Sequence, residues 1–103
     1  IIAQGYRMGA TGAIAGMSNV IPKLMTDMFK ALMEKRDEEA DKLQEEVNVI
    51  RDVNRLATMP SVLKRALELG NIAEAGPARK PVFETTPELD EKIKEMLKHY
   101  GLI

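Results

Sequence analysis

The chain contains no cysteine and only one histidine, His99. The absence of cysteine excludes disulfides, thiolate metal sites and a cysteine nucleophile. A single histidine excludes a metal site built from several imidazoles. We therefore expect neither a metal ion nor a cofactor in this chain.

The chain also lacks a charge excess and a long apolar run. Its formal net charge is −1 over 103 residues, whereas binding to phosphate backbones requires a concentrated basic surface. No apolar stretch approaches the roughly 18–20 residues of a membrane span. We expect no nucleic-acid partner and no membrane partner. The absence of cysteine fits a reducing cytoplasm, which is the expected compartment.

The most informative segment, residues 9–22, reads GATGAIAGMSNVIP. Gly9 is the expected cap of a helix remnant over residues 1–8. The apolar residues 13–15, between two glycines, predict a short strand buried on both faces, as in a parallel sheet. Because one strand cannot satisfy its own backbone groups, its partner strands are expected outside this chain. The chain is therefore expected to be the C-terminal piece of a larger α/β protein.

Helical signals dominate the remainder of the chain. Pro22 suits the first turn of a helix that reaches about residue 34. Asp37 is a candidate N-cap for a helix to about residue 57. Apolar spacing and cap residues predict two more helices: one after Pro60 with Gly70 as its left-handed cap, and one capped by Thr86 with Pro87 in its first turn, ended by Gly101. Residues 71–84 are expected to form an ordered extended crossing.

No complete catalytic site is expected within the chain. His99 suits a surface role at a helix C-terminus, where cations complement the dipole. Lys23 and Lys64 are expected to be surface helix residues, because an amine nucleophile needs a desolvated pocket. The glycines of residues 9–16 lack the lysine of a phosphate loop. What remains is the main chain from Ile14 to Asn19, because active sites of (β/α)8 enzymes form at the C-terminal ends of strands.

Four motifs resemble the dihydrodipicolinate synthase / N-acetylneuraminate lyase superfamily. Residues 9–22 resemble its last barrel strand and loop, Gly-Ala-x-Gly-(Ala/Val)-Ile-Ser-x-x-x-Asn-Val-x-Pro. Residues 60–70, PSVLKRALELG, and residues 76–81, GPARKP, resemble its later helix and its Gly-x-x-Arg-x-Pro crossing. The ending LKHYGLI is similar to the usual terminus. The motifs follow in order over nearly the whole chain, although Ala15 replaces the common serine.

The resemblance implies an α/β fold, namely the C-terminal part of a (β/α)8 barrel followed by a three-helix extension. Residues 1–34 would hold the end of helix seven, strand eight and helix eight, and residues 35–103 the extension. Family members are class I aldolases in which a lysine, outside this chain, forms a Schiff base with pyruvate. Ile14 matches the position whose main-chain carbonyl faces the pyruvate site, and it is the only site residue carried over.

The resemblance also implies partners. These are the N-terminal rest of the barrel, pyruvate or another 2-oxo acid with an aldehyde, and further copies in a tetramer or dimer. Met8 matches the end of a helix near a subunit contact. The replacement at Ala15 leaves sugar-acid aldolases and other oxo-acid lyases open. Two alternatives also stay open: a free-standing helical interaction module without catalysis, and a non-catalytic regulatory relative with the same barrel.

Overall fold

The computed structural model describes all residues, 1–103, and contains helices only. In chain order they are α1 (Ile2–Arg7), the 3-10 helix η1 (Gly16–Asn19), α2 (Pro22–Met33), α3 (Asp37–Asn54), α4 (Ser61–Leu69) and α5 (Pro87–His99). The expectation of a mostly helical chain is confirmed. The chain divides into two compact units, Ile1–Val49 and Ile50–Ile103. The boundary expected at residues 34/35, between barrel end and extension, stays a prediction.

The strand expected at residues 13–15 is not formed in this structure. Residues 10–15 carry no regular secondary structure, although Ala15 has extended dihedrals of φ −130° and ψ 115°. The physical reason is that a strand is defined by a ladder with a second extended segment. All regular elements of this chain are helices. No second extended segment is therefore available to pair with residues 13–15.

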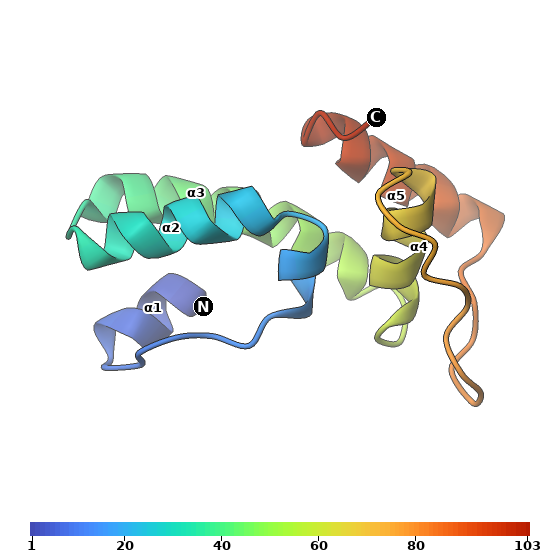
Figure 1. Cartoon of the computed structure of the whole chain (residues 1–103), viewed down its shortest axis with the longest axis horizontal. Coiled ribbons are helices and arrows are strands. Elements are labelled where there is room, and N and C mark those ends of the chain that lie inside the picture. The colour runs from blue at the N-terminus through green and yellow to red at the C-terminus, as the bar shows by residue number, and fades with distance from the viewer. The chain divides into compact units, whose positions relative to one another are not determined.

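In the first unit, α1 packs beside α2 (Figure 1). The rings of Tyr6 and Phe29 meet edge to face with their centroids 5.8 Å apart, which is a favourable aromatic geometry. The amide of Ala3 donates to Gln44 Oε1 at 2.9 Å. The buried apolar side chains of this unit belong to Ala3, Val20, Ile21, Met28, Ala31, Leu32, Ala40 and Val47.

In the second unit, α4 packs against α5 (Figure 1). Its buried apolar side chains belong to Ile50, Val62, Leu63, Ala66, Leu89, Ile93, Met96 and Leu97. The hydroxyl of Tyr100 accepts a hydrogen bond from the amide of Ile50 at 3.0 Å. This contact joins residues that are 50 positions apart in the sequence, and it ties the end of α5 to α3.

Four helices end in the same way. In each, the residue after the C-cap has a left-handed backbone, and the next amide bonds back to the carbonyl five residues earlier. Gly9 (φ 105°) and Gly101 (φ 67°) fill this position as expected. The expectation for Gly70 is wrong: its φ is −84°, and Asn71 (φ 51°) takes the left-handed position. Lys35 (φ 56°) fills it after α2.

The helix starts follow the sequence signals with one shift. Pro22 is the first residue of α2, as expected from its missing N–H group. The Thr86 hydroxyl accepts from the Leu89 amide at 3.3 Å and caps α5, with Pro87 as the first helical residue. Asp37 is not the residue before α3 but its first helical residue, and α3 ends at Asn54, earlier than expected.

Candidate functional site

A tight turn follows the extended residue Ala15. The backbone enters η1, and two side chains fold back onto carbonyls at its start. The hydroxyl of Ser18 donates to the Ala15 carbonyl at 2.6 Å, and the Ser18 amide donates to the same oxygen at 3.1 Å. Asn19 Nδ2 donates to the Gly16 carbonyl at 2.8 Å. Serine and asparagine favour such turns because their short side chains reach nearby backbone groups.

The carbonyl of Ile14 is the last in a run of carbonyls, residues 9–14, that accept no hydrogen bond, and the run ends where the turn begins. The carbonyls of Ala15 and Gly16 each accept at least one hydrogen bond, whereas that of Ile14 accepts none. The residue is fully exposed. The structure therefore offers the Ile14 carbonyl as an unused main-chain acceptor at the point where the extended segment enters its turn.

A free carbonyl can bind but cannot transfer a proton. It accepts a hydrogen bond or faces a positively polarised group, and residues 9–19 contain no titratable side chain. The turn is therefore a binding and orienting element. The sequence pointed to the main chain from Ile14 to Asn19 and assigned no role to the side chains of Ser18 and Asn19. A better signal was available, since serine and asparagine three residues after Ala15 and Gly16 are typical of backbone-capping turns.

The residues considered for other chemistry lie on helices outside this turn. Lys23 is exposed and pairs with Asp27 at 2.5 Å on the same helix, so its amine is not desolvated. Lys64 lies in the other unit, half-exposed on α4. His99 lies in the last turn of α5, where its ring meets that of Tyr100 edge to face.

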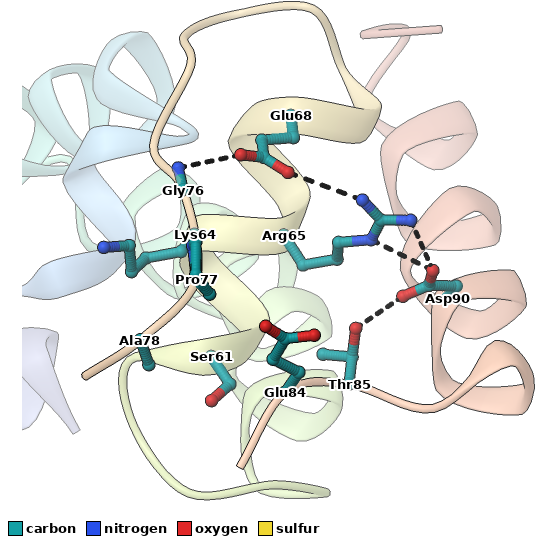
Figure 2. Close-up of a pocket in the computed structure, with 10 residues that line it drawn as sticks. All are labelled: Ser61, Lys64, Arg65, Glu68, Gly76, Pro77, Ala78, Glu84, Thr85 and Asp90. Atoms are coloured by element: carbon teal, nitrogen blue, oxygen red, sulfur yellow. Dashed lines mark hydrogen bonds and ion pairs between the residues drawn. The ribbon is translucent and has the colours of Figure 1, made fainter. Parts of the chain in front are cut away.

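A polar cleft of about 240 Å³ lies in the second unit. Figure 2 shows its lining from α4, the crossing segment and the start of α5. In this cleft, Arg65 donates hydrogen bonds to two carboxylates. Its Nε and Nη2 atoms lie 3.0 and 2.7 Å from Asp90 Oδ2, and its Nη1 atom lies 3.4 Å from Glu68 Oε2. The other carboxylate oxygens of these acids bind the crossing segment, through the Gly76 amide at 2.8 Å and the Thr85 hydroxyl at 2.6 Å.

The electrostatics of this cleft indicate a structural role. The hydrogen bond from Arg65 lowers the pKa of the Asp90 carboxyl, against the opposing effect of burial, and the Thr85 hydroxyl lowers it further. A carboxylate stabilised in its charged form is a poor general acid or base near neutral pH. The network ties Gly76 to α4 and Thr85 to α5, which holds the crossing segment, residues 71–86, in place without regular secondary structure.

Two further observations concern ligands and membranes. No group of three or more histidine, aspartate or glutamate side chains is placed to hold a metal ion. None of the helices has both the length and the apolar content that crossing a bilayer requires.

Comparison with known proteins gives the family. The model of the dihydrodipicolinate synthetase family matches residues 1–100. The chain belongs to this family. The resemblance inferred from the four motifs is thereby confirmed, and the match is to the C-terminal part of dihydrodipicolinate synthases.

Similar relatives and structures agree with this membership. The 4-hydroxy-tetrahydrodipicolinate synthase of Archaeoglobus fulgidus is 36% identical over 96 residues, which cover 93% of this chain and 33% of the relative. That of Ehrlichia canis is 36% identical over 102 residues, 98% of this chain and 33% of the relative. A crystal structure of a dihydrodipicolinate synthase matches with a TM-score of 0.89 and 26% identity, over 98% of this chain and 35% of that one. The chain spans about a third of the length of these relatives.

Proposed function

We propose that this chain is the C-terminal segment of a lyase that forms a Schiff base with pyruvate. The enzyme joins the bound pyruvate to an aldehyde, or in the reverse direction splits an aldol product into pyruvate and an aldehyde. The chemistry named for its relatives, 4-hydroxy-tetrahydrodipicolinate synthesis, is the favoured reaction. The catalytic lysine belongs to the part of the longer protein that this chain does not include. The segment's own contribution is to close the barrel and to present the Ile14 carbonyl to the bound 2-oxo acid. The proposal includes a homo-oligomer, a tetramer or dimer, in the cytoplasm.

The observation that carries the proposal is the state of the Ile14 carbonyl. The turn from Ala15 to Asn19 uses the two following carbonyls internally and leaves that of Ile14 available. An iminium formed between a lysine and a 2-oxo acid is positively polarised, and a carbonyl oxygen facing it stabilises that charge. Because the group is part of the main chain, no side chain at residue 14 has to carry the chemistry.

Exposed apolar side chains favour a segment of a larger protein over a free-standing helical module. Ile14, Met8 and Phe83 are 109%, 80% and 86% exposed. Soluble monomers rarely expose large apolar surfaces without a partner to cover them. The family match also assigns nearly the whole chain to an enzyme family, which gives a binding module without catalysis no support.

Reductive trapping tests the proposal. The full-length protein is incubated with pyruvate and borohydride, digested and mapped by mass spectrometry. We expect one pyruvate-dependent adduct on a lysine outside residues 1–103 and none on Lys23 or Lys64. A label on either of these two lysines, or no pyruvate-dependent label at all, would contradict the proposed mechanism.

A second measurement separates the reactions that family membership leaves open. Pyruvate consumption is followed with a panel of aldehydes, including sugar-derived ones, and the products are identified by mass. We expect 4-hydroxy-tetrahydrodipicolinate from the preferred aldehyde. Turnover only with sugar-derived aldehydes would instead assign a sugar-acid aldolase, with the Schiff-base step unchanged.

A further inference from the structure

We infer that Ser18 and Asn19 are positioning residues that fix the direction of the Ile14 carbonyl. They act through the backbone of the turn and need not touch the substrate. The inference rests on the proposed function, because it concerns the same carbonyl. It adds two side chains to a site for which sequence reasoning identified only Ile14.

The backbone of Ala15 relates the directions of the Ile14 and Ala15 carbonyls. This residue is extended, with φ −130° and ψ 115°, and an extended residue directs the carbonyls on its two sides in nearly opposite directions. The carbonyl of Ile14 therefore points away from that of Ala15. As long as Ala15 stays extended, restraining its carbonyl also limits the directions in which the Ile14 carbonyl can point.

Ser18 holds the Ala15 carbonyl through two hydrogen bonds. Its amide and its hydroxyl donate to the same oxygen, at 3.1 and 2.6 Å. One donor alone leaves the peptide plane free to tilt about the hydrogen bond, whereas two donors from one residue restrict that tilt. The hydroxyl can thus contribute to orientation in addition to the ordinary backbone bond of η1.

Gly16, the first residue of η1, is restrained by the side chain of Asn19. Glycine has the widest conformational freedom of any residue, and such a residue after Ala15 loosens the turn. The bond from Asn19 Nδ2 to the Gly16 carbonyl, at 2.8 Å, restrains it. Ser18 and Asn19 therefore restrain two consecutive peptide planes next to the free carbonyl.

The hydrogen bonds of the Ser18 and Asn19 side chains are expected to affect the position of the carbonyl more than the stability of the fold. Both side chains are exposed, so water can replace their hydrogen bonds when they are removed. Their loss is expected to cost little folding stability, since exposed bonds exchange readily with solvent. A misdirected carbonyl nevertheless weakens binding of the 2-oxo acid, because the loss of one well-aligned hydrogen bond costs up to about tenfold in affinity.

The experiment uses the full-length enzyme and three substitutions. Ser18→Ala removes the hydroxyl, Asn19→Asp keeps the shape but removes the donor, and Ser18→Thr retains a hydroxyl. We expect KM for pyruvate to rise up to about tenfold in the first two, as for the loss of one hydrogen bond, with kcat changed less and the melting temperature nearly unchanged. The Ser18→Thr variant keeps a hydroxyl at this position and should retain the wild-type KM for pyruvate.

Thr26→Ala is the matched control. The Thr26 hydroxyl donates to the Pro22 carbonyl at 2.9 Å, so the substitution removes the same kind of bond within α2. We expect it to leave KM and kcat unchanged. An Asn19→Ala variant repeats the Asn19 test with a neutral side chain, which removes any effect of the new carboxylate.

The outcomes distinguish this inference from the proposed function. If wild-type enzyme shows no pyruvate-dependent borohydride adduct, the proposed function fails and the inference fails with it. If the adduct forms and Ser18→Ala, Asn19→Asp and Asn19→Ala all keep the wild-type KM, only the inference is overturned. The inference is also overturned if Ser18→Ala and the Asn19 variants melt at a lower temperature that explains their raised KM, and if Ser18→Thr shows the same defect.

Discussion

Arg65 holds Asp90 through two nitrogens that share one oxygen, with Nη2 2.7 Å and Nε 3.0 Å from Oδ2. The pair links α4 to α5, and the Asp90 side chain is 17% exposed against 38% for Arg65. Partly buried, charge-assisted pairs of this kind are stronger than ordinary surface ion pairs. The pair is therefore a charge-assisted link between α4 and α5.

Removing this link is expected to destabilise the protein. Asp90→Asn should lower the free energy of unfolding by about 1–2 kcal/mol, because hydrogen bonds to charged groups contribute about 1.5–3 kcal/mol and partial exposure of Arg65 reduces that value. Urea unfolding followed by circular dichroism measures the change. The control is Glu91→Gln, which disrupts the exposed Lys94–Glu91 pair on α5 and should cost at most about 0.5 kcal/mol.

The same carboxylate predicts a pH dependence. Arg65 and Thr85 lower the pKa of Asp90 in the folded protein below its ordinary value of 3.8. A lowered folded pKa means that the unfolded chain takes up the proton more readily, so the Asp90 contribution is present well above pH 3.8 and is lost as the pH falls below it. The stability difference between wild type and Asp90→Asn should be largest near pH 7 and should shrink towards pH 3. A difference that stays constant from pH 7 to pH 3 would rule out this linkage.

The left-handed residue after α2 offers a stabilising substitution. Lys35 has φ 56°, a region that costs a residue with a Cβ atom about 1 kcal/mol more than glycine. Lys35→Gly should raise the free energy of unfolding by about 0.5–1 kcal/mol. Glu34→Gly is the control, because Glu34 has φ −85°; glycine there adds unfolded-state entropy and removes the exposed ion pair with Arg36, so it should lower the free energy of unfolding. Equal effects of the two substitutions in urea unfolding would argue against the left-handed strain.

Helix positions were predictable because their signals are local. Pro22, Thr86, Gly9 and Gly101 act within a few residues of their own position, and the structure places all four as expected. Gly70 shows the limit of this reasoning, because glycine and the following Asn71 can both adopt the left-handed backbone. A Cβ atom on Gly70 would lie 3.1 Å from the Ala66 carbonyl and 3.3 Å from the Ile72 side chain, so tight packing fixes the glycine there.

Contacts between distant residues were not predictable. Arg65 and Asp90 lie on two separately predicted helices, and nothing local in the sequence indicates that they meet across 25 residues. The expected strand failed for a related reason, since its ladder depends on partners that local pattern cannot supply. The family resemblance pointed to the Ile14 carbonyl, but only the structure shows that no hydrogen bond within the chain uses it.

A backbone substitution tests the role of the Ile14 carbonyl directly. Replacing Ala15 with lactic acid converts the Ile14–Ala15 amide into an ester, whose carbonyl is a weaker acceptor, while every side chain is retained. The Ala15 amide donates no hydrogen bond in the structure, so its loss should leave stability nearly unchanged. In the full-length enzyme, KM for pyruvate should rise about three- to tenfold, the equivalent of about 0.5–1.5 kcal/mol for one hydrogen bond.

The matching control is the same replacement at Ala10, whose amide donates to the Gly5 carbonyl at 3.0 Å. That ester removes a helix-capping bond and should lower the melting temperature while KM stays unchanged. Opposite patterns at two nearby positions separate an acceptor role of the Ile14 carbonyl from a general effect of an ester in this segment. An unchanged KM with the ester at residue 15 would remove the Ile14 carbonyl from the binding site, because the acceptor would have been weakened without consequence for the 2-oxo acid.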